Sequence, residues 1–92
     1  MSTYFMFGKY SQASIKEISA KRTQEAIHLV EQNGGQLKAG YALLGETDLL
    51  IMADFPGNEQ AMKTSVALSK LLGVAFTTYP AVSMEEFDKL VG

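Results

Sequence analysis

The sequence contains no cysteine, one histidine and no cluster of basic residues. Without cysteine there can be no disulfide, no thiolate nucleophile and no thiolate metal site. The eight lysines and arginines are scattered along the 92 residues, and the net charge is −2. Neutralising phosphates requires clustered basic side chains, so this distribution argues against nucleic acid as the main partner.

Long hydrophobic runs are also missing. No apolar stretch approaches the ~20 residues that a membrane span needs. The chain begins Met1-Ser2-Thr3, without a basic segment or a cleavage site, which argues against a secretory signal. We therefore expect no membrane partner and a cytoplasmic location. The length fits a single domain over residues 1–92, and a domain this small buries only roughly 60–65% of its unfolded surface, so it gains stability from association.

Short strand-like runs alternate with longer helical patterns. Strands are expected at Tyr4–Lys9, Gln36–Leu44, Asp48–Phe55 and Val74–Tyr79. Helices are expected at about Gln12–Gln32 with a break before Ala20, at Glu59–Leu72 capped by Asn58, and at Met84–Val91 with Phe87 and Leu90 anchored inward. This order predicts an α+β, ferredoxin-like βαββαβ fold with a C-terminal helix, in which the first and third strands are central in an antiparallel four-stranded sheet.

The third strand has apolar residues on both of its faces. Leu49, Ile51, Ala53 and Phe55 alternate with Asp48, Leu50, Met52 and Asp54, so each set points to one side of the sheet. The first set suits a face covered by helices. An uncovered second face would be a larger apolar patch than a monomer tolerates. We therefore expect a homodimer, or a larger assembly of such dimers, that pairs through the sheets; the alternative is a monomer whose last helix covers this face.

The chain contains several short motifs in a distinctive order: Phe7-Gly-Lys-Tyr-Ser11, Gly34-Gly35, Tyr41-Ala-Leu-Leu-Gly45, Asp48-Leu-Leu-Ile-Met-Ala-Asp54-Phe55-Pro56, Ser65-Val-Ala-Leu-Ser69 and Thr77-Thr78. On these motifs the chain resembles, over nearly its whole length, the GYD-domain family within the dimeric α/β-barrel group. The resemblance implies a ferredoxin-like fold and dimers that pair through their sheets to form a barrel. It implies no activity, because the family's biochemistry is largely unassigned. Thr47 stands where the family usually carries tyrosine, so no role of that ring carries over to this chain.

The corner between the second and third strands contains two residues that the resemblance does carry over, Gly45 and Asp48. Gly45 can supply a positive φ, and the Asp48 carboxylate can accept hydrogen bonds from backbone amides. The corner is also similar to that of the ligand-sensing domains of leucine-responsive regulators and of small barrel monooxygenases. Because those groups differ in function, a structural turn is the favoured interpretation.

The candidate ligand-binding residues are hydroxyl-bearing side chains among apolar neighbours, Tyr10, Tyr41, Thr77 and Tyr79, together with Asp54. Such a set suits a pocket that orients a small apolar or aromatic ligand. Asp54 can act as a base or polar anchor at a cavity mouth, cap the following helix, or pair with Lys9.

No metal site or cofactor is expected. The single histidine, His28, has polar helical neighbours and should face solvent, so a zinc or haem site would lack convergent ligands. Ser65 and Ser69 have no histidine partner that would activate them as nucleophiles.

Three functions remain open. The favoured one is a non-catalytic homo-oligomeric domain that binds a small ligand or serves as a structural module, because the chain lacks convergent titratable groups. The second is a cofactor-independent barrel-type oxygenase or isomerase acting on a hydrophobic phenolic or quinone-like molecule, which requires a buried ionisable residue such as Asp54 in a cavity. The third is an accessory domain that acts through a protein partner and keeps an apolar patch exposed after dimer formation.

Overall fold

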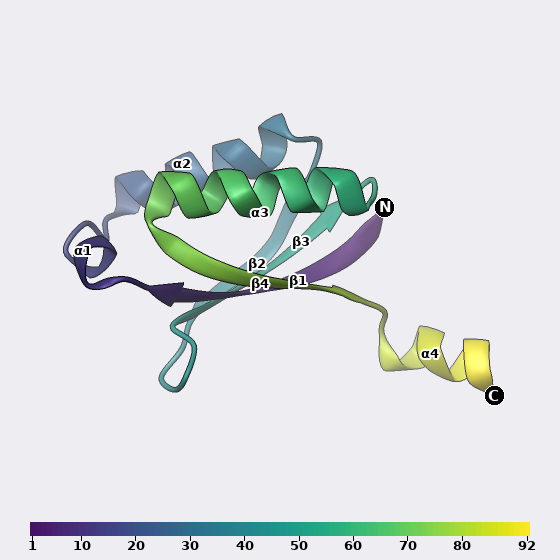
Figure 1. The fold of residues 1–92 in the computed structure, drawn as a ribbon. Helices are drawn as coiled ribbons and strands as arrows, with labels where there is room; N and C mark the ends of the chain where they lie inside the picture. The colour runs from purple at the N-terminus through teal and green to yellow at the C-terminus, as the bar shows by residue number, and fades with distance from the viewer.

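The computed structural model describes residues 1–92 and consists of one antiparallel sheet with two helices packed on a single face (Figure 1). The elements are, in order, β1 (Ser2–Tyr10), α1 (Gln12–Ile15), α2 (Ala20–Gln32), β2 (Gln36–Ala42), β3 (Leu49–Phe55), α3 (Asn58–Leu72), β4 (Val74–Ala81) and α4 (Met84–Val91). The strand order β2-β3-β1-β4 places β1 and β3 in the middle. The predicted ferredoxin-like topology is therefore confirmed. None of these helices combines the length and the apolar character that crossing a membrane requires.

The predicted break in the first helical region separates α1 from α2. Ser11 caps α1 in a capping box with Ser14, and the Ser19 hydroxyl caps α2 by accepting a hydrogen bond from the Arg22 backbone N–H at 3.2 Å. Gly34, with φ of 80°, follows the end of α2, a conformation that glycine adopts without steric cost. The chain then turns directly into β2.

The core lies between the sheet and the helices α2 and α3. Its largest fully buried side chains are Met6, Val30, Phe55, Leu68, Val74 and Thr64. The rings of Tyr4 and Phe55 meet edge to face, with centroids 5.8 Å apart. Ala53 and Phe55 are fully buried, and Ile51 packs against the same cluster, as the alternation along β3 predicts.

The start of α3 differs from the expectation. Gly57, not Asn58, is the N-cap residue, and no side chain caps the helix. Asn58 instead accepts a hydrogen bond from the Tyr4 hydroxyl at 2.5 Å, because Tyr4 points from the central strand toward this helix end. A second bond, 2.6 Å between the Ser65 and Thr78 hydroxyls, links α3 to β4.

The other face of the sheet carries no helix (Figure 1). Strand register places on this open face the side chains of Phe5, Phe7, Leu50, Met52, Thr77 and Tyr79. The Phe7 and Tyr79 rings pack edge to face with centroids 5.9 Å apart. The open face is therefore apolar and aromatic at its centre, as the two-sided pattern of the strands predicts.

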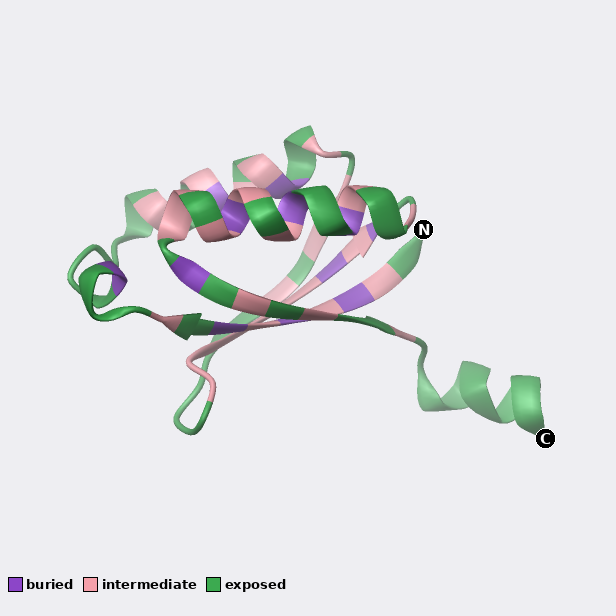
Figure 2. Cartoon of the chain, viewed as in Figure 1, coloured by how far each residue is buried: buried purple, intermediate pink, exposed green.

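Helix α4 does not cover the open face. It projects away from the end of β4, and Figure 2 shows it exposed along its whole length. Phe87 is 46% exposed and Leu90 75% exposed. The prediction that these two residues anchor inward is wrong, because the chain has no surface of its own within reach of them. A monomer closed by its own last helix is likewise not what the structure contains.

The loop between β2 and β3 spans residues 43–48 and is closed by a hydrogen bond from the Leu43 N–H to the Asp48 carbonyl at 2.8 Å. The Asp48 carboxylate accepts the Tyr10 N–H, and the Asp48 N–H donates to the Gly8 carbonyl, both at 2.8 Å. The Asp48 carboxylate thus accepts a hydrogen bond from a backbone amide, the contact expected of a structural turn residue. The predicted positive φ at Gly45 is wrong, since only Gly34 and Gly73 have positive φ.

The packing of α3 generates a stability prediction. Leu68 is fully buried, whereas Met62 on the same helix is 68% exposed. Leu68→Ala should lower the free energy of unfolding by about 2–5 kcal/mol, because it removes buried methyl groups and leaves a cavity. Met62→Ala should change it by less than about 0.5 kcal/mol. Urea unfolding measures both, and similar losses for the two variants would contradict this packing of α3.

Candidate functional site

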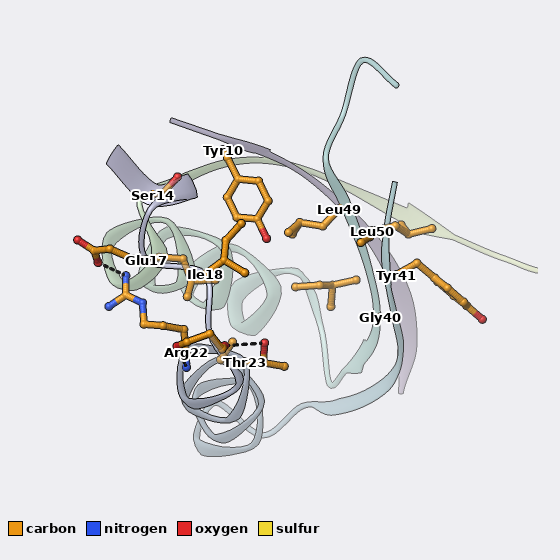
Figure 3. Close-up of a pocket in the computed structure, with 15 residues that line it drawn as sticks. Tyr10, Ser14, Glu17, Ile18, Arg22, Thr23, Gly40, Tyr41, Leu49 and Leu50 are labelled. Atoms are coloured by element: carbon orange, nitrogen blue, oxygen red, sulfur yellow. Dashed lines mark hydrogen bonds and ion pairs between the residues drawn. The ribbon is translucent and has the colours of Figure 1, made fainter. Parts of the chain in front are cut away.

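A pocket of about 360 Å³ opens between the α1–α2 corner and the adjoining parts of β2 and β3 (Figure 3). Its apolar lining includes Ile18, Ala26, Leu49, Ile51 and Leu72. Ser14, Glu17, Arg22 and Thr23 provide polar groups from the helical side, and Tyr10 comes from the end of β1. The pocket thus combines an apolar interior with a few polar groups, which is the usual composition of small-molecule sites.

The break between α1 and α2 forms one wall of this pocket. Helix α1 ends at Ile15, and Glu17 and Ile18 lie in the segment between it and α2. Arg22, in the first turn of α2, lies next to this segment. The Arg22 guanidinium lies 3.4 Å from the Glu17 carboxylate and donates a hydrogen bond to the Leu71 backbone carbonyl in the last turn of α3. A cation is favourable there, because the last carbonyls of a helix are unpaired and partly negative.

Tyr10 is the most distinctive polar group of the pocket. Its ring points into the pocket from the end of β1 (Figure 3), and its backbone N–H is held by Asp48. Burial raises the pKa of the Tyr10 hydroxyl above its ordinary value of 10.0, and the Asp48 carboxylate adds to the rise. The hydroxyl is therefore neutral at physiological pH and can both donate and accept a hydrogen bond.

The hydroxyl residues predicted from the sequence do not converge. Tyr10 and Tyr41 both line the pocket, but the Tyr41 ring points away from it (Figure 3). Strand register places Tyr41, Thr77 and Tyr79 on the open face of the sheet. The predicted set is thus divided between two surfaces on opposite sides of the sheet.

Asp54 lies at the far end of β3 and outside the pocket. Its carboxylate accepts a hydrogen bond from the Thr3 hydroxyl at 2.7 Å and lies 3.6 Å from the Lys38 ammonium. The expected pairing with Lys9 is wrong, since Lys9 belongs to the opposite end of β1. Asp54 also does not cap α3, because that helix has no side-chain cap. Its contacts are those of a strand-end ion pair.

Sequence reasoning missed the helical side of the pocket. Ser14, Glu17, Ile18, Arg22 and Thr23 come from the α1–α2 corner. The capping serines did indicate where the corner is, but not that the chain there faces a pocket. The bond from Arg22 to Leu71 joins residues 49 positions apart, and no local pattern indicates such a contact.

His28 is exposed, as its helical neighbours predict. It borders a shallow hollow on the outer surface of α2 and α3 together with Glu25 and Gln32. No three histidine, aspartate or glutamate side chains gather anywhere in the structure in a way that could hold a metal ion.

The position of Tyr10 leads to a prediction on pH dependence. Below pH 10 its hydroxyl is protonated in both the folded and the unfolded chain and contributes no pH dependence. Above pH 10 the unfolded chain loses this proton first, so the stability of the fold should fall as the pH rises toward the raised pKa of Tyr10. Absorbance titration of the four tyrosines should contain a late phase that Tyr10→Phe removes and Tyr41→Phe retains. A late phase that persists in Tyr10→Phe would contradict the assignment.

Comparison with solved structures finds a similar fold in the leucine response regulatory protein LrpA of Mycobacterium tuberculosis. The TM-score is 0.60, the alignment covers 90% of this chain and 51% of that one, and the sequences are 8% identical. At this identity the likeness concerns the fold alone, and the chain spans about half the length of that protein.

Comparison of sequences identifies the family of the chain, whereas comparison of structures identifies only its fold. No curated protein has a sequence that matches this chain. The pattern that defines the GYD domain matches residues 4–91, and the chain therefore belongs to the GYD domain family.

Proposed function

We propose that the chain is a homodimeric module that binds a small apolar or aromatic ligand in the pocket beside Tyr10. The observation that carries the proposal is the pocket itself, with its apolar lining, the neutral Tyr10 hydroxyl and the Arg22 guanidinium at one wall. Its volume of about 360 Å³ falls in the range of roughly 300–1,000 Å³ that is typical of small-molecule sites.

The lining indicates the chemistry of the ligand. Ile18, Leu49 and Ile51 offer apolar contact area, which suits a ring or a branched aliphatic group. Tyr10 and Arg22 offer hydrogen-bond donors, which suit a carbonyl, phenol or carboxylate at one end of the molecule. The structurally similar regulatory protein is named for a response to leucine, and leucine has this combination of a branched side chain and a carboxylate.

Binding is favoured over catalysis by the way the acidic groups are engaged. Asp54, the expected base of the barrel-type enzyme, is paired with Lys38 outside the pocket. Within the pocket, Glu17 is paired with Arg22, and the raised pKa of Tyr10 makes its hydroxyl a poor acid at neutral pH. The enzyme alternative therefore lacks the free general base that an oxygenase or isomerase without a cofactor would use.

One observation favours the accessory-domain alternative. Met62 and Val66 lie one helical turn apart on α3 and are both largely exposed. They form a small apolar strip on the helix layer, away from the open face of the sheet. Such a strip would stay exposed in a dimer that pairs through the sheets, as a docking site for another protein requires.

The composition of the open face supports the proposal that two copies pair through it. Phe5, Phe7 and Met52 lie side by side at its centre through the register of β1 with β3. Contiguous apolar surface of this kind marks an interface rather than a wetted surface. A second copy is the natural cover, since twofold symmetry places like surface against like surface.

The ligand proposal predicts thermal stabilisation. Aromatic acids, quinones and leucine are suitable probes at millimolar concentration. A ligand present at 100 times its Kd stabilises the folded state by about 2.7 kcal/mol, which in a domain of this size raises the melting temperature by roughly 10 °C or more. If none of these compounds moves the melting temperature, the ligand class is wrong.

Gly40 offers a matched control within the pocket. It lines the pocket, and a Cβ atom added there meets no heavy atom within 4 Å. Gly40→Leu should fill the pocket without disturbing the strand and abolish the ligand-induced shift. Gly45→Ala, which also adds a side chain into open space but lies outside the pocket, should leave the shift intact.

The assembly proposal predicts a mass of twice the 10.0 kDa of one chain by light scattering at micromolar concentration. Phe7→Glu should weaken the dimer by at least about tenfold, because it buries a carboxylate in the paired open faces. Met62→Glu, on the helix layer, should leave the mass unchanged. A wild-type mass of one chain would end the dimer proposal.

A further inference from the structure

Helix α4 has a well-formed start and an apolar side without a partner in the chain. The Ser83 hydroxyl caps it by accepting the Glu86 N–H at 3.1 Å. Its large apolar residues share one side of the helix and are all exposed: Met84, Phe87, Leu90 and Val91. An isolated helix of this length is unstable in water unless its apolar side is buried against something. Because α4 projects clear of the other elements (Figure 1), the chain itself provides no such surface.

A second apolar feature protrudes at the opposite end of the sheet. Leu44, in the β2–β3 loop, is fully exposed, and Leu43 beside it is more than one third exposed. The loop is nevertheless held firmly, because Asp48 bonds to the backbone of both Gly8 and Tyr10. Figure 1 shows the loop and α4 both directed to the open side of the sheet, one at each end.

The surface area of the chain shows how much is left to cover. A compact monomer of 10.0 kDa has an accessible surface of about 5,200 Å², whereas this chain has 6281 Å². The radius of gyration is 13.6 Å, compared with about 12.3 Å for a compact domain of this length. The excess of about 1,000 Å² is close to the roughly 800 Å² that each partner buries in a stable interface. The extra surface is therefore of the size that a second copy of the chain would cover.

Charge favours the same occupant. Helix α4 carries three acidic residues and one lysine, and two of the acids, Glu86 and Asp88, form no ion pair in the chain. At the loop end of the sheet, Lys9 on the open face and Lys16 after α1 also form no ion pair. The acidic helix α4 is thus complementary to Lys9 and Lys16 at the loop end of the sheet. The loop itself also carries an acidic residue, the exposed Glu46.

We infer that α4 of each copy docks on the Leu43–Leu44 loop of its partner, so that two exchanged arms close the paired open faces at both ends. The register of β1 places Ala81, just before α4, and Leu49, just after the loop, at opposite ends of the sheet. A twofold axis that lies between the sheets and across the strands brings the α4 end of one copy to the loop end of the other. This inference rests on the homodimer proposed above and specifies its contacts.

Engineered cysteines test the contact, and the natural sequence contains none that would interfere. The double variant Leu44→Cys/Phe87→Cys should form a covalent dimer on non-reducing electrophoresis under mild oxidation. A disulfide needs Cα atoms within about 7 Å of each other. The two positions in one chain are separated by at least the length of β3, roughly 23 Å, so with α4 placed as in this structure a bond can form only between copies.

The matched control is Leu44→Cys/Lys89→Cys, which places the second cysteine on the polar side of α4. We expect it to cross-link at least ten times more slowly. A separate double variant without engineered cysteines, Phe87→Ser/Leu90→Ser, removes apolar contact from α4. It should retain the β-sheet signal in circular dichroism and raise the dimer dissociation constant at least tenfold in sedimentation experiments.

The outcomes separate this inference from the proposed function. A wild-type dimer in solution that fails to cross-link in the double variant overturns the exchange of arms and leaves the dimer standing. A disulfide within a single chain also overturns it, since α4 would then fold onto its own copy. A monomeric wild type overturns both, whereas rapid cross-linking confined to Leu44→Cys/Phe87→Cys supports the exchanged arms.

Discussion

The structure depends on one constraint: a four-stranded sheet has two faces, and the chain has helices for only one of them. Strand alternation sends Met6, Ala53 and Phe55 to the covered face, where α2 and α3 bury them. The same alternation forces Phe5, Phe7 and Met52 to the other side. The strand residues that build the core thus have neighbours in sequence that face away from it, and at Phe5, Phe7 and Met52 these neighbours are apolar.

Much of the fold could be predicted from local patterns, because the signals involve residues close in sequence. Serine caps marked the break before α2, and Gly34 marked its end. The failures have physical causes. Gly45 does not need a positive φ because it lies in a loop over residues 43–48, closed by the hydrogen bond between Leu43 and Asp48, and not in a tight turn. The amphipathic pattern of α4 indicated a buried side, but periodicity does not reveal what covers it, and the chain offers no cover for Phe87 or Leu90.

The pocket was harder to predict than the fold, because it is made by contacts that are distant in sequence. Arg22 meets a backbone carbonyl at the end of α3, which no residue type can indicate. The predicted hydroxyl set could have been divided from strand alternation alone. Tyr10 shares a face with Tyr4 and Met6, whereas Thr77 and Tyr79 pair with Phe7 and Phe5 on the open face. Asp54 was associated with the wrong lysine because the sequence does not reveal strand register.

The pocket and the proposed interface meet at one residue. Through its carboxylate Asp48 holds the backbone of Tyr10, whose ring lines the pocket, and through its backbone it anchors the loop that carries Leu43 and Leu44. An arm docked on that loop would therefore press on the same short segment that orients the Tyr10 ring. If both proposals hold, a ligand that shifts Tyr10 and a partner bound to the loop would act on one set of hydrogen bonds. Any resulting coupling between their binding free energies would have to be equal in both directions.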